Sequence, residues 1–173
     1  GHDHGTGSVL EVFGVSADVE RALWAHLLNI DLVRRFVVDC GPVDDVVRSC
    51  VRDKRAVLVT GLYDEQWLRI LDVGAALSAR AWPPGRALVV EVTDDRFAEN
   101  CGRWRISDDG VSSTGEPADL ATDIASLSAA YLGATSWWEL AAAGAVRALH
   151  DRALAQADEL FAVRPLAFCG SEF

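Results

Sequence analysis

Apolar residues in the first third of the chain recur with the periods of short strands and helices. The alternating, β-branched segments predict strands, and there are three of them: 9–15, 33–38 and 56–62. Ser16 suits the N-cap of a helix that reaches about residue 30, and Pro42 suits the first turn of a shorter helix. A β-α-β-α-β run of this length is too small for a complete α/β domain. We therefore interpret residues 9–60 as the C-terminal part of such a domain.

The pattern changes at about residue 61. Apolar alternation predicts four further strands, at 67–73, 86–93, 102–107 and 110–114. Apolar residues at helical spacing predict four helices, at 74–82, 120–132, 136–143 and 151–162. A hairpin turn signal, Asp108-Asp109-Gly110, joins two of the strands. A meandering sheet with helices gathered at the end predicts the α+β class, with residues 61–173 as one domain.

The first eight residues differ from both predicted domains. Residues 1–8 are polar and rich in glycine, which is typical of a loose leader or tag remnant. The 173 residues include no methionine, so we expect the chain to begin inside a longer protein. Hydrophobic residues make up 50% of the sequence and charged residues 24%, a balance that predicts a folded core rather than disorder.

The formal net charge of −10 narrows the choice of partners. A negative field disfavours nucleic acid and anionic membrane surfaces and attracts polycations, although solubility alone is the better explanation of such a charge in an acidic domain. One lysine, Lys54, stands beside many arginines, alanines and valines, which suggests a GC-rich, actinobacterial source.

Cysteine and hydropathy patterns indicate a reduced, cytoplasmic protein. The four cysteines are at positions 40, 50, 101 and 169, without the C-x-x-C spacing of a structural zinc site. No run of about 20 apolar residues predicts a membrane span.

Several local runs resemble the Eis (enhanced intracellular survival) acetyltransferases. They are LWAHLLNIDLV at 23–33, WLRILDVGAALSAR at 67–80, LVVEVTD at 88–94, DIASLSAAYLG at 123–133, LAAAG at 140–144, and a tail that ends in phenylalanine. Their order and spacing cover nearly all of the chain after the leader. Members of this family combine a catalytic GNAT domain that binds acetyl-CoA, a second GNAT-like domain, and a sterol carrier protein-like domain. The resemblance assigns residues 9–60 to the end of the second GNAT-like domain and residues 61–173 to the sterol carrier protein-like domain.

The resemblance also implies a function for the end of the chain. The family acetylates amines, including aminoglycosides and lysine side chains, and assembles into hexamers. The carboxylate of the last residue, here Phe173, is the expected general base, with an upstream tyrosine as acid. Glu172 would add negative charge for a polycationic amine. The expected partners are thus the catalytic GNAT domain of the same chain, the amine substrate and further copies of the protein.

The sequence lacks two features that acetyl transfer by a GNAT enzyme would need. It has no R/Q-x-x-G-x-G/A turn, which GNAT enzymes use to hold the pyrophosphate of acetyl-CoA on backbone N–H groups. Neither Tyr63 nor Tyr131 falls where the family's acid would be. We therefore expect no bound cofactor and no acetyl transfer from these 173 residues by themselves.

Two functions from other classes stay open at this point. A sterol or lipid carrier would need an apolar tunnel between sheet and helices, which Trp67, Trp104 and Trp137 could line, although core packing explains these residues better. The other alternative is a purely structural oligomerisation domain. His150 has no acid partner by sequence spacing, and the pairs Asp94-Asp95 and Asp108-Asp109 are typical of turns rather than of catalytic dyads.

Overall fold

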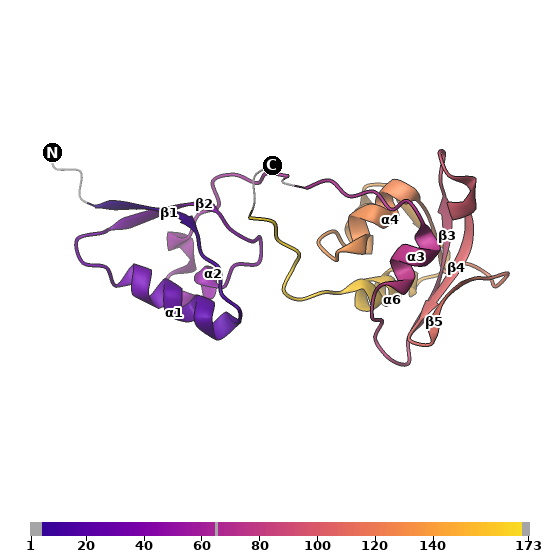
Figure 1. Ribbon diagram of the computed structural model, residues 1–173, viewed down its shortest axis with the longest axis horizontal. Coiled ribbons are helices and arrows are strands. Elements are labelled where there is room, and N and C mark those ends of the chain that lie inside the picture. The colour runs from indigo at the N-terminus through magenta and orange to yellow at the C-terminus, as the bar shows by residue number, and fades with distance from the viewer. Residues whose placement is uncertain (1–4, 65, 171–173) are drawn as a thin grey trace. The chain divides into compact units, whose positions relative to one another are not determined.

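The chain forms two units that make most of their contacts internally. The first comprises residues 1–66 together with Phe168–Phe173, and the second comprises Trp67–Ala167. The computed structural model describes residues 5–64 and 66–170 (Figure 1). The backbone therefore passes from the first unit to the second near residue 66, and returns after Ala167.

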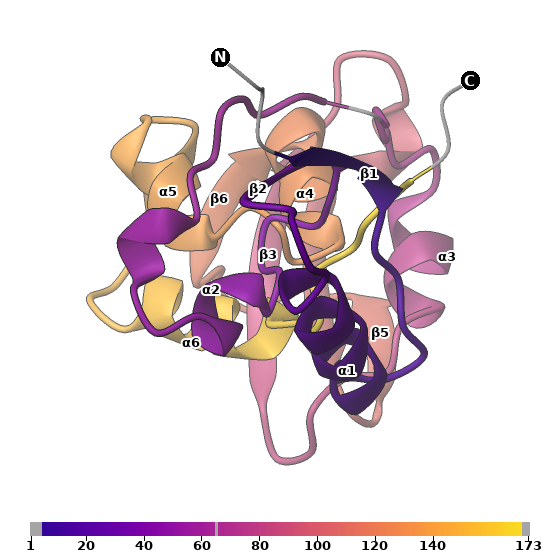
Figure 2. The same cartoon turned by 90° about the vertical axis from the view of Figure 1, so that its left-hand side faces the viewer.

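The described part of the first unit contains a two-stranded parallel sheet, two α-helices and a short 3-10 helix, η1 (Lys54–Ala56). Strand β1 (Thr6–Glu11) pairs with β2 (Arg35–Cys40), from Thr6 beside Arg35 to Glu11 beside Cys40. Helix α1 (Ala17–Leu28) connects the strands and α2 (Val47–Cys50) follows them, both on the same side of the β1–β2 ribbon in Figures 1 and 2. The Ser16 hydroxyl accepts a hydrogen bond from the Val19 N–H, which confirms the predicted N-cap.

Few apolar side chains of the first unit are fully buried. Among its described residues, Val12 and Trp24 are the apolar side chains with less than a tenth of their surface exposed. Leu10, Phe13 and Val15 are respectively 76%, 67% and 89% exposed. Parallel strands normally have both faces covered, so this unit has the character of one part of a larger domain.

The second unit is built on a five-stranded mixed sheet of order β5-β4-β3-β6-β7. Strands β3 (Ala87–Thr93), β4 (Gly102–Ser107) and β5 (Gly110–Ser113) are consecutive and antiparallel, as predicted. Strand β6 (Leu120–Asp123) runs parallel to β3 on its other side, and β7 (Val146–Ala148) pairs antiparallel with β6. The chain thus has the α+β class that the sequence predicts.

Helices cover one face of this sheet. They are α3 (Val73–Ser78), α4 (Ile124–Tyr131), α5 (Trp137–Ala142) and α6 (Ala153–Phe161); Figure 1 shows α3, α4 and α6 on the same side of β3. The alternate residues Leu88, Val90 and Val92 of β3 point into the core, each at most 1% exposed. Three aromatic side chains complete the core, because the Phe161 ring lies 5.0 Å from the rings of both Trp82 and Trp137.

Three predictions of secondary structure are wrong, for two physical reasons. Residues 56–62 and 67–73 have strand-like sequences but no strand partner, and Leu58, Leu62 and Trp67 are 75–85% exposed. A strand exists only by pairing, so apolar alternation alone does not make one. The predicted helix at 120–132 begins instead with strand β6, and Asp123 then caps α4 by accepting from the Ser126 N–H at 2.7 Å.

Candidate functional site

The two predicted site residues, Phe173 and Glu172, lie outside the described residues. The structure does describe the segment that leads to them, residues 162–170, which we call the C-terminal tail. The site is therefore built here from the residues around the start of the tail, at the end of α6.

The tail begins where α6 ends. Ala162 is the C-cap of α6 and has extended backbone angles, φ −54° and ψ 130°, which turn the chain out of the helix. The last carbonyls of a helix have no donor within the helix. A side chain supplies one at the end of α6, since Arg80 Nη2 donates to the Phe161 carbonyl at 3.2 Å.

Arg80 itself is enclosed by aromatic rings. Its guanidinium carbon lies 4.4 Å from the centroid of the Trp82 ring, 5.1 Å from Phe161 and 5.6 Å from Tyr131. Nη1 donates to the Tyr131 carbonyl at the end of α4, and the Tyr131 hydroxyl donates to Ala76 of α3 at 2.7 Å. Arg80 has no carboxylate partner in the part of the chain that the structure describes.

The chemistry available to Arg80 is binding rather than proton transfer. Burial lowers the pKa of the Arg80 guanidinium, and the nearby Tyr131 partly offsets this effect. Arginine nevertheless stays protonated in proteins, so it acts as a fixed fork of donors. The positive charge lies at the C-terminal ends of α4 and α6, where the helix dipoles are negative.

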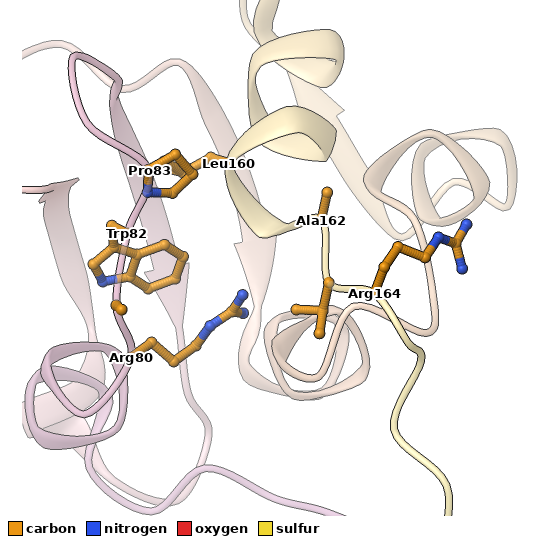
Figure 3. Close-up of a pocket in the computed structure, with 8 residues that line it drawn as sticks. Arg80, Trp82, Pro83, Leu160, Ala162 and Arg164 are labelled. Atoms are coloured by element: carbon orange, nitrogen blue, oxygen red, sulfur yellow. The ribbon is translucent and has the colours of Figure 1, made fainter. Parts of the chain in front are cut away.

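An open hollow of about 500 Å³ lies beside this arginine (Figure 3). It is lined by Arg80, Ala81, Trp82, Pro83, Leu160, Ala162, Val163 and Arg164. A second hollow of about 250 Å³ shares Ala162, Val163 and Arg164 with the first. The first residues of the tail therefore border both hollows.

His150 has an acid partner that sequence spacing could not reveal. Its Nε2 lies 2.9 Å from Asp119 Oδ1, and its Nδ1 accepts from the Arg152 N–H at 3.3 Å. Asp119 also accepts from the Val89 N–H at 2.7 Å, which connects the pair to the central strand. Because both imidazole nitrogens and both carboxylate oxygens have these partners, the geometry is that of a structural link rather than of a base beside a nucleophile.

Asp94 is the centre of a turn, in agreement with the structural interpretation of its sequence. Its side chain has no exposed surface and bonds Arg69 at 2.6 Å and Asn100 Nδ2 at 2.8 Å. Burial alone would raise the pKa of Asp94, but the hydrogen bonds from Asn100, Arg96 and Phe97 and the Arg69 charge together lower it. The structure therefore favours the ionised carboxylate.

We expect Asp94→Asn to change the dependence of stability on pH. A carboxyl group with a lowered pKa in the folded state stabilises the protein above its unfolded pKa of about 4, and this contribution is lost as the pH falls through the folded value. The variant should be less stable than the wild type at neutral pH, and the difference should shrink in acid. Urea unfolding from neutral pH to about pH 2 measures this. A difference that is constant with pH would contradict the assignment.

The three tryptophans proposed to line a tunnel have different environments. Trp137 is fully buried in the core, whereas Trp67 is 85% exposed and Trp104 is half-buried. Packed side chains of the core occupy the space between sheet and helices. This arrangement disfavours a lipid carrier, which needs several hundred Å³ of apolar space there.

Neither a metal site nor a membrane span is found in the part of the chain that the structure describes. Within residues 5–64 and 66–170, no three or more histidine, cysteine, aspartate or glutamate side chains gather where a metal ion could bind. None of the helices in the same ranges combines the length and apolar character that crossing a bilayer requires.

Comparison with known families gives two matches that follow the division of the fold. Residues 1–70 match the acetyltransferase (GNAT) domain, and residues 73–170 match the sterol carrier protein domain. The chain therefore joins a GNAT-like acetyltransferase segment to a sterol carrier protein domain.

Comparison with individual proteins narrows the family further. An uncharacterized N-acetyltransferase of Streptomyces coelicolor is 38% identical over 88% of this chain and 38% of its own length. The N-acetyltransferase Eis of Mycobacterium tuberculosis is 34% identical over 89% of this chain and 38% of its own length. The crystal structure of Eis1 from Mycobacterium abscessus matches all of this chain and 45% of that chain, with a TM-score of 0.91 and 39% identity.

This protein belongs to the Eis-like, GNAT-type N-acetyltransferases. It corresponds to their C-terminal region, including the sterol carrier protein-like domain, as its sequence motifs predict. The chain spans about two fifths of the length of the curated relatives that it matches. These relatives come from Streptomyces and Mycobacterium, actinobacteria of the kind that the arginine-rich composition predicts.

Proposed function

We propose that this chain supplies the terminal carboxylate of an acetyl-CoA-dependent amine N-acetyltransferase. The match of almost the whole chain to Eis proteins carries the proposal. The substrates would be aminoglycosides or lysine-type amines, and acetyl-CoA would bind to a catalytic GNAT domain further upstream in the same polypeptide. The negative charge of this chain suits a polycationic amine.

The proposed chemistry requires one proton acceptor from this chain. An amine must lose a proton before its nitrogen attacks the thioester carbonyl, and a carboxylate held about 3 Å from that nitrogen can accept it. The new C–N bond forms as the C–S bond breaks, and the CoA thiolate leaves and takes a proton from the upstream acid. The Phe173 carboxylate is the proposed base, and Glu172 adds negative charge beside it.

One structural feature supports a role as part of a larger enzyme. The first unit leaves Leu10, Phe13 and Val15 exposed around a parallel ribbon, which suits a surface that the rest of a GNAT-like domain covers. Further copies of the protein would complete the assembly, as a homo-oligomer.

We expect this 173-residue chain to be folded but silent as an acetyltransferase. The physical reason is that it lacks the glycine-rich turn that holds the pyrophosphate of acetyl-CoA. Release of free CoA thiol in the presence of acetyl-CoA and an aminoglycoside measures turnover. The matched comparison is the same chain extended upstream to the length of its relatives, which should be active. Comparable turnover by the two proteins would contradict the proposal.

A further inference from the structure

Arg80 differs from the other partly buried arginines of the second unit. Arg69, Arg103 and Arg105 each have a guanidinium nitrogen near a carboxylate oxygen, at 2.6, 3.8 and 3.6 Å respectively. Arg80 has no such partner among the described residues, although residues 67–167 contain 14 acidic residues and 9 arginines. A charged side chain that is partly removed from water is normally paired. The described structure therefore leaves the charge of Arg80 without a counter-ion.

The hydrogen-bonding capacity of Arg80 is also only partly used. A guanidinium has five N–H donors. Two of them donate to protein groups in the described structure, one to the Tyr131 carbonyl and one to the Phe161 carbonyl. The Trp82 ring, 4.4 Å from the guanidinium carbon, attracts the cation but is not a carboxylate acceptor. Arg80 therefore keeps donors that a further anion can use.

The hollow of about 500 Å³ gives an anion access to this arginine. In Figure 3 the Arg80 side chain extends beside the Trp82 ring toward the segment that carries Ala162, whereas the Arg164 side chain is directed away from Arg80. None of the residues that line the hollow is acidic. A ligand in the hollow would therefore meet Arg80 as its main cation.

The acidic residues in the last turn of α6 have other partners. Asp158 accepts a hydrogen bond from the Trp137 N–H at 2.6 Å, and Glu159 forms an ion pair with Arg86. Neither of them lines the hollow beside Arg80. The described side chains of the second unit therefore leave room at Arg80 for a partner from solution.

We propose that this hollow of the sterol carrier protein domain binds a small organic anion, a carboxylate attached to an apolar body. A guanidinium binds a carboxylate through parallel N–H bonds, which fix both its position and its orientation. Trp82, Pro83, Leu160 and Val163 supply apolar surface for the body of the ligand. The site is formed by the second unit alone and does not depend on acetyl transfer. It also differs from the interior tunnel of a lipid carrier, since it opens to solvent at the end of α6.

Titration of this chain with 3-phenylpropionate, followed by NMR, tests the site. The Trp82 indole N–H donates to the Leu77 carbonyl at 2.9 Å and is a fixed reporter beside the hollow. Its signal should shift and saturate with a Kd on the order of 1–10 mM, the affinity of a ligand with about ten heavy atoms. The neutral 3-phenylpropionamide and the bare anion acetate should each bind at least about tenfold more weakly. Absence of a saturable shift, or equal binding of the amide, would overturn the proposal.

Variants at Ala81, an exposed residue that lines the hollow, test the role of charge. Ala81→Glu adds a carboxylate that competes for Arg80 and should weaken binding of 3-phenylpropionate about tenfold, whereas the neutral Ala81→Gln should keep the affinity within about twofold. Arg80→Lys should also weaken binding about tenfold, because an ammonium lacks the rigid fork, and Arg86→Lys, outside the hollow, should not. Equal affinities of the two Ala81 variants would overturn the proposal, even if Arg80→Lys fails to fold.

Discussion

Appending a few residues after Phe173 is expected to lower acetyl transfer about 10²–10⁴-fold in the chain extended to the length of its relatives. This range is the usual contribution of a general base. The extension converts the terminal carboxylate into a peptide carbonyl, which cannot accept a proton from the amine at neutral pH. The steady-state rate of CoA thiol release measures the effect, and circular dichroism shows that the protein remains folded.

The control for this experiment is the same peptide placed at the N-terminus, which should leave turnover unchanged. A protease site before the C-terminal peptide provides a second control only if cleavage leaves Phe173 as the last residue, and activity should then return. Deletion of Phe173 alone should not preserve activity, because the new carboxylate on Glu172 would be one residue short and without its aromatic side chain. Full turnover by the C-terminally extended enzyme would refute the base assignment and leave Phe173 an ordinary chain end.

Replacing Trp137 by alanine is expected to destabilise the second unit by about 3–5 kcal/mol, the usual cost of removing a buried aromatic side chain. Trp137 has no exposed surface, and its ring packs edge-on against Phe161 at 5.0 Å. Its Nε1–H has no hydrogen-bond partner among the described residues. Trp137→Phe should therefore cost less than Trp137→Ala, since it retains most of the apolar contact and removes a buried donor that is not bonded.

The neighbouring Trp138 provides the matched control. It is on the same helix but 63% exposed, so Trp138→Ala should change stability by no more than about 0.5 kcal/mol. Urea unfolding of the four proteins, followed by far-UV circular dichroism, compares the free energies of unfolding. Similar losses for Trp137→Ala and Trp138→Ala would contradict the packing described here.

Local signals in the sequence were sufficient wherever one short segment decides the structure. Ser136 and Glu139 form the capping box that starts α5, and Asp108-Asp109-Gly110 turns β4 into β5, because turn and cap chemistry depends on adjacent residues. The sequence did not predict strand β7, because its three residues are too few to show apolar alternation. Its existence depends on β6, with which it pairs.

Local sequence patterns were also insufficient to predict the residues of the candidate site. The sequence named Phe173 through family resemblance, but not Arg80, which no local motif distinguishes from other arginines. The environment of Arg80 depends on its hydrogen bond to the Phe161 carbonyl, across 81 positions of sequence.

The sequence by itself determined the α+β class, the starts of α1 and α5, the consecutive antiparallel strands and the resemblance to the Eis-like family. These depend on apolar periodicity, on caps and turns, and on motifs that are each contained in a short stretch of chain. Only the tertiary structure decided which strand-like segments pair, that β6 runs parallel to β3, that His150 bonds Asp119, and that Arg80 holds the end of α6. Each of these requires two distant segments to meet, and the energy of such a contact depends on packing that neither segment encodes alone.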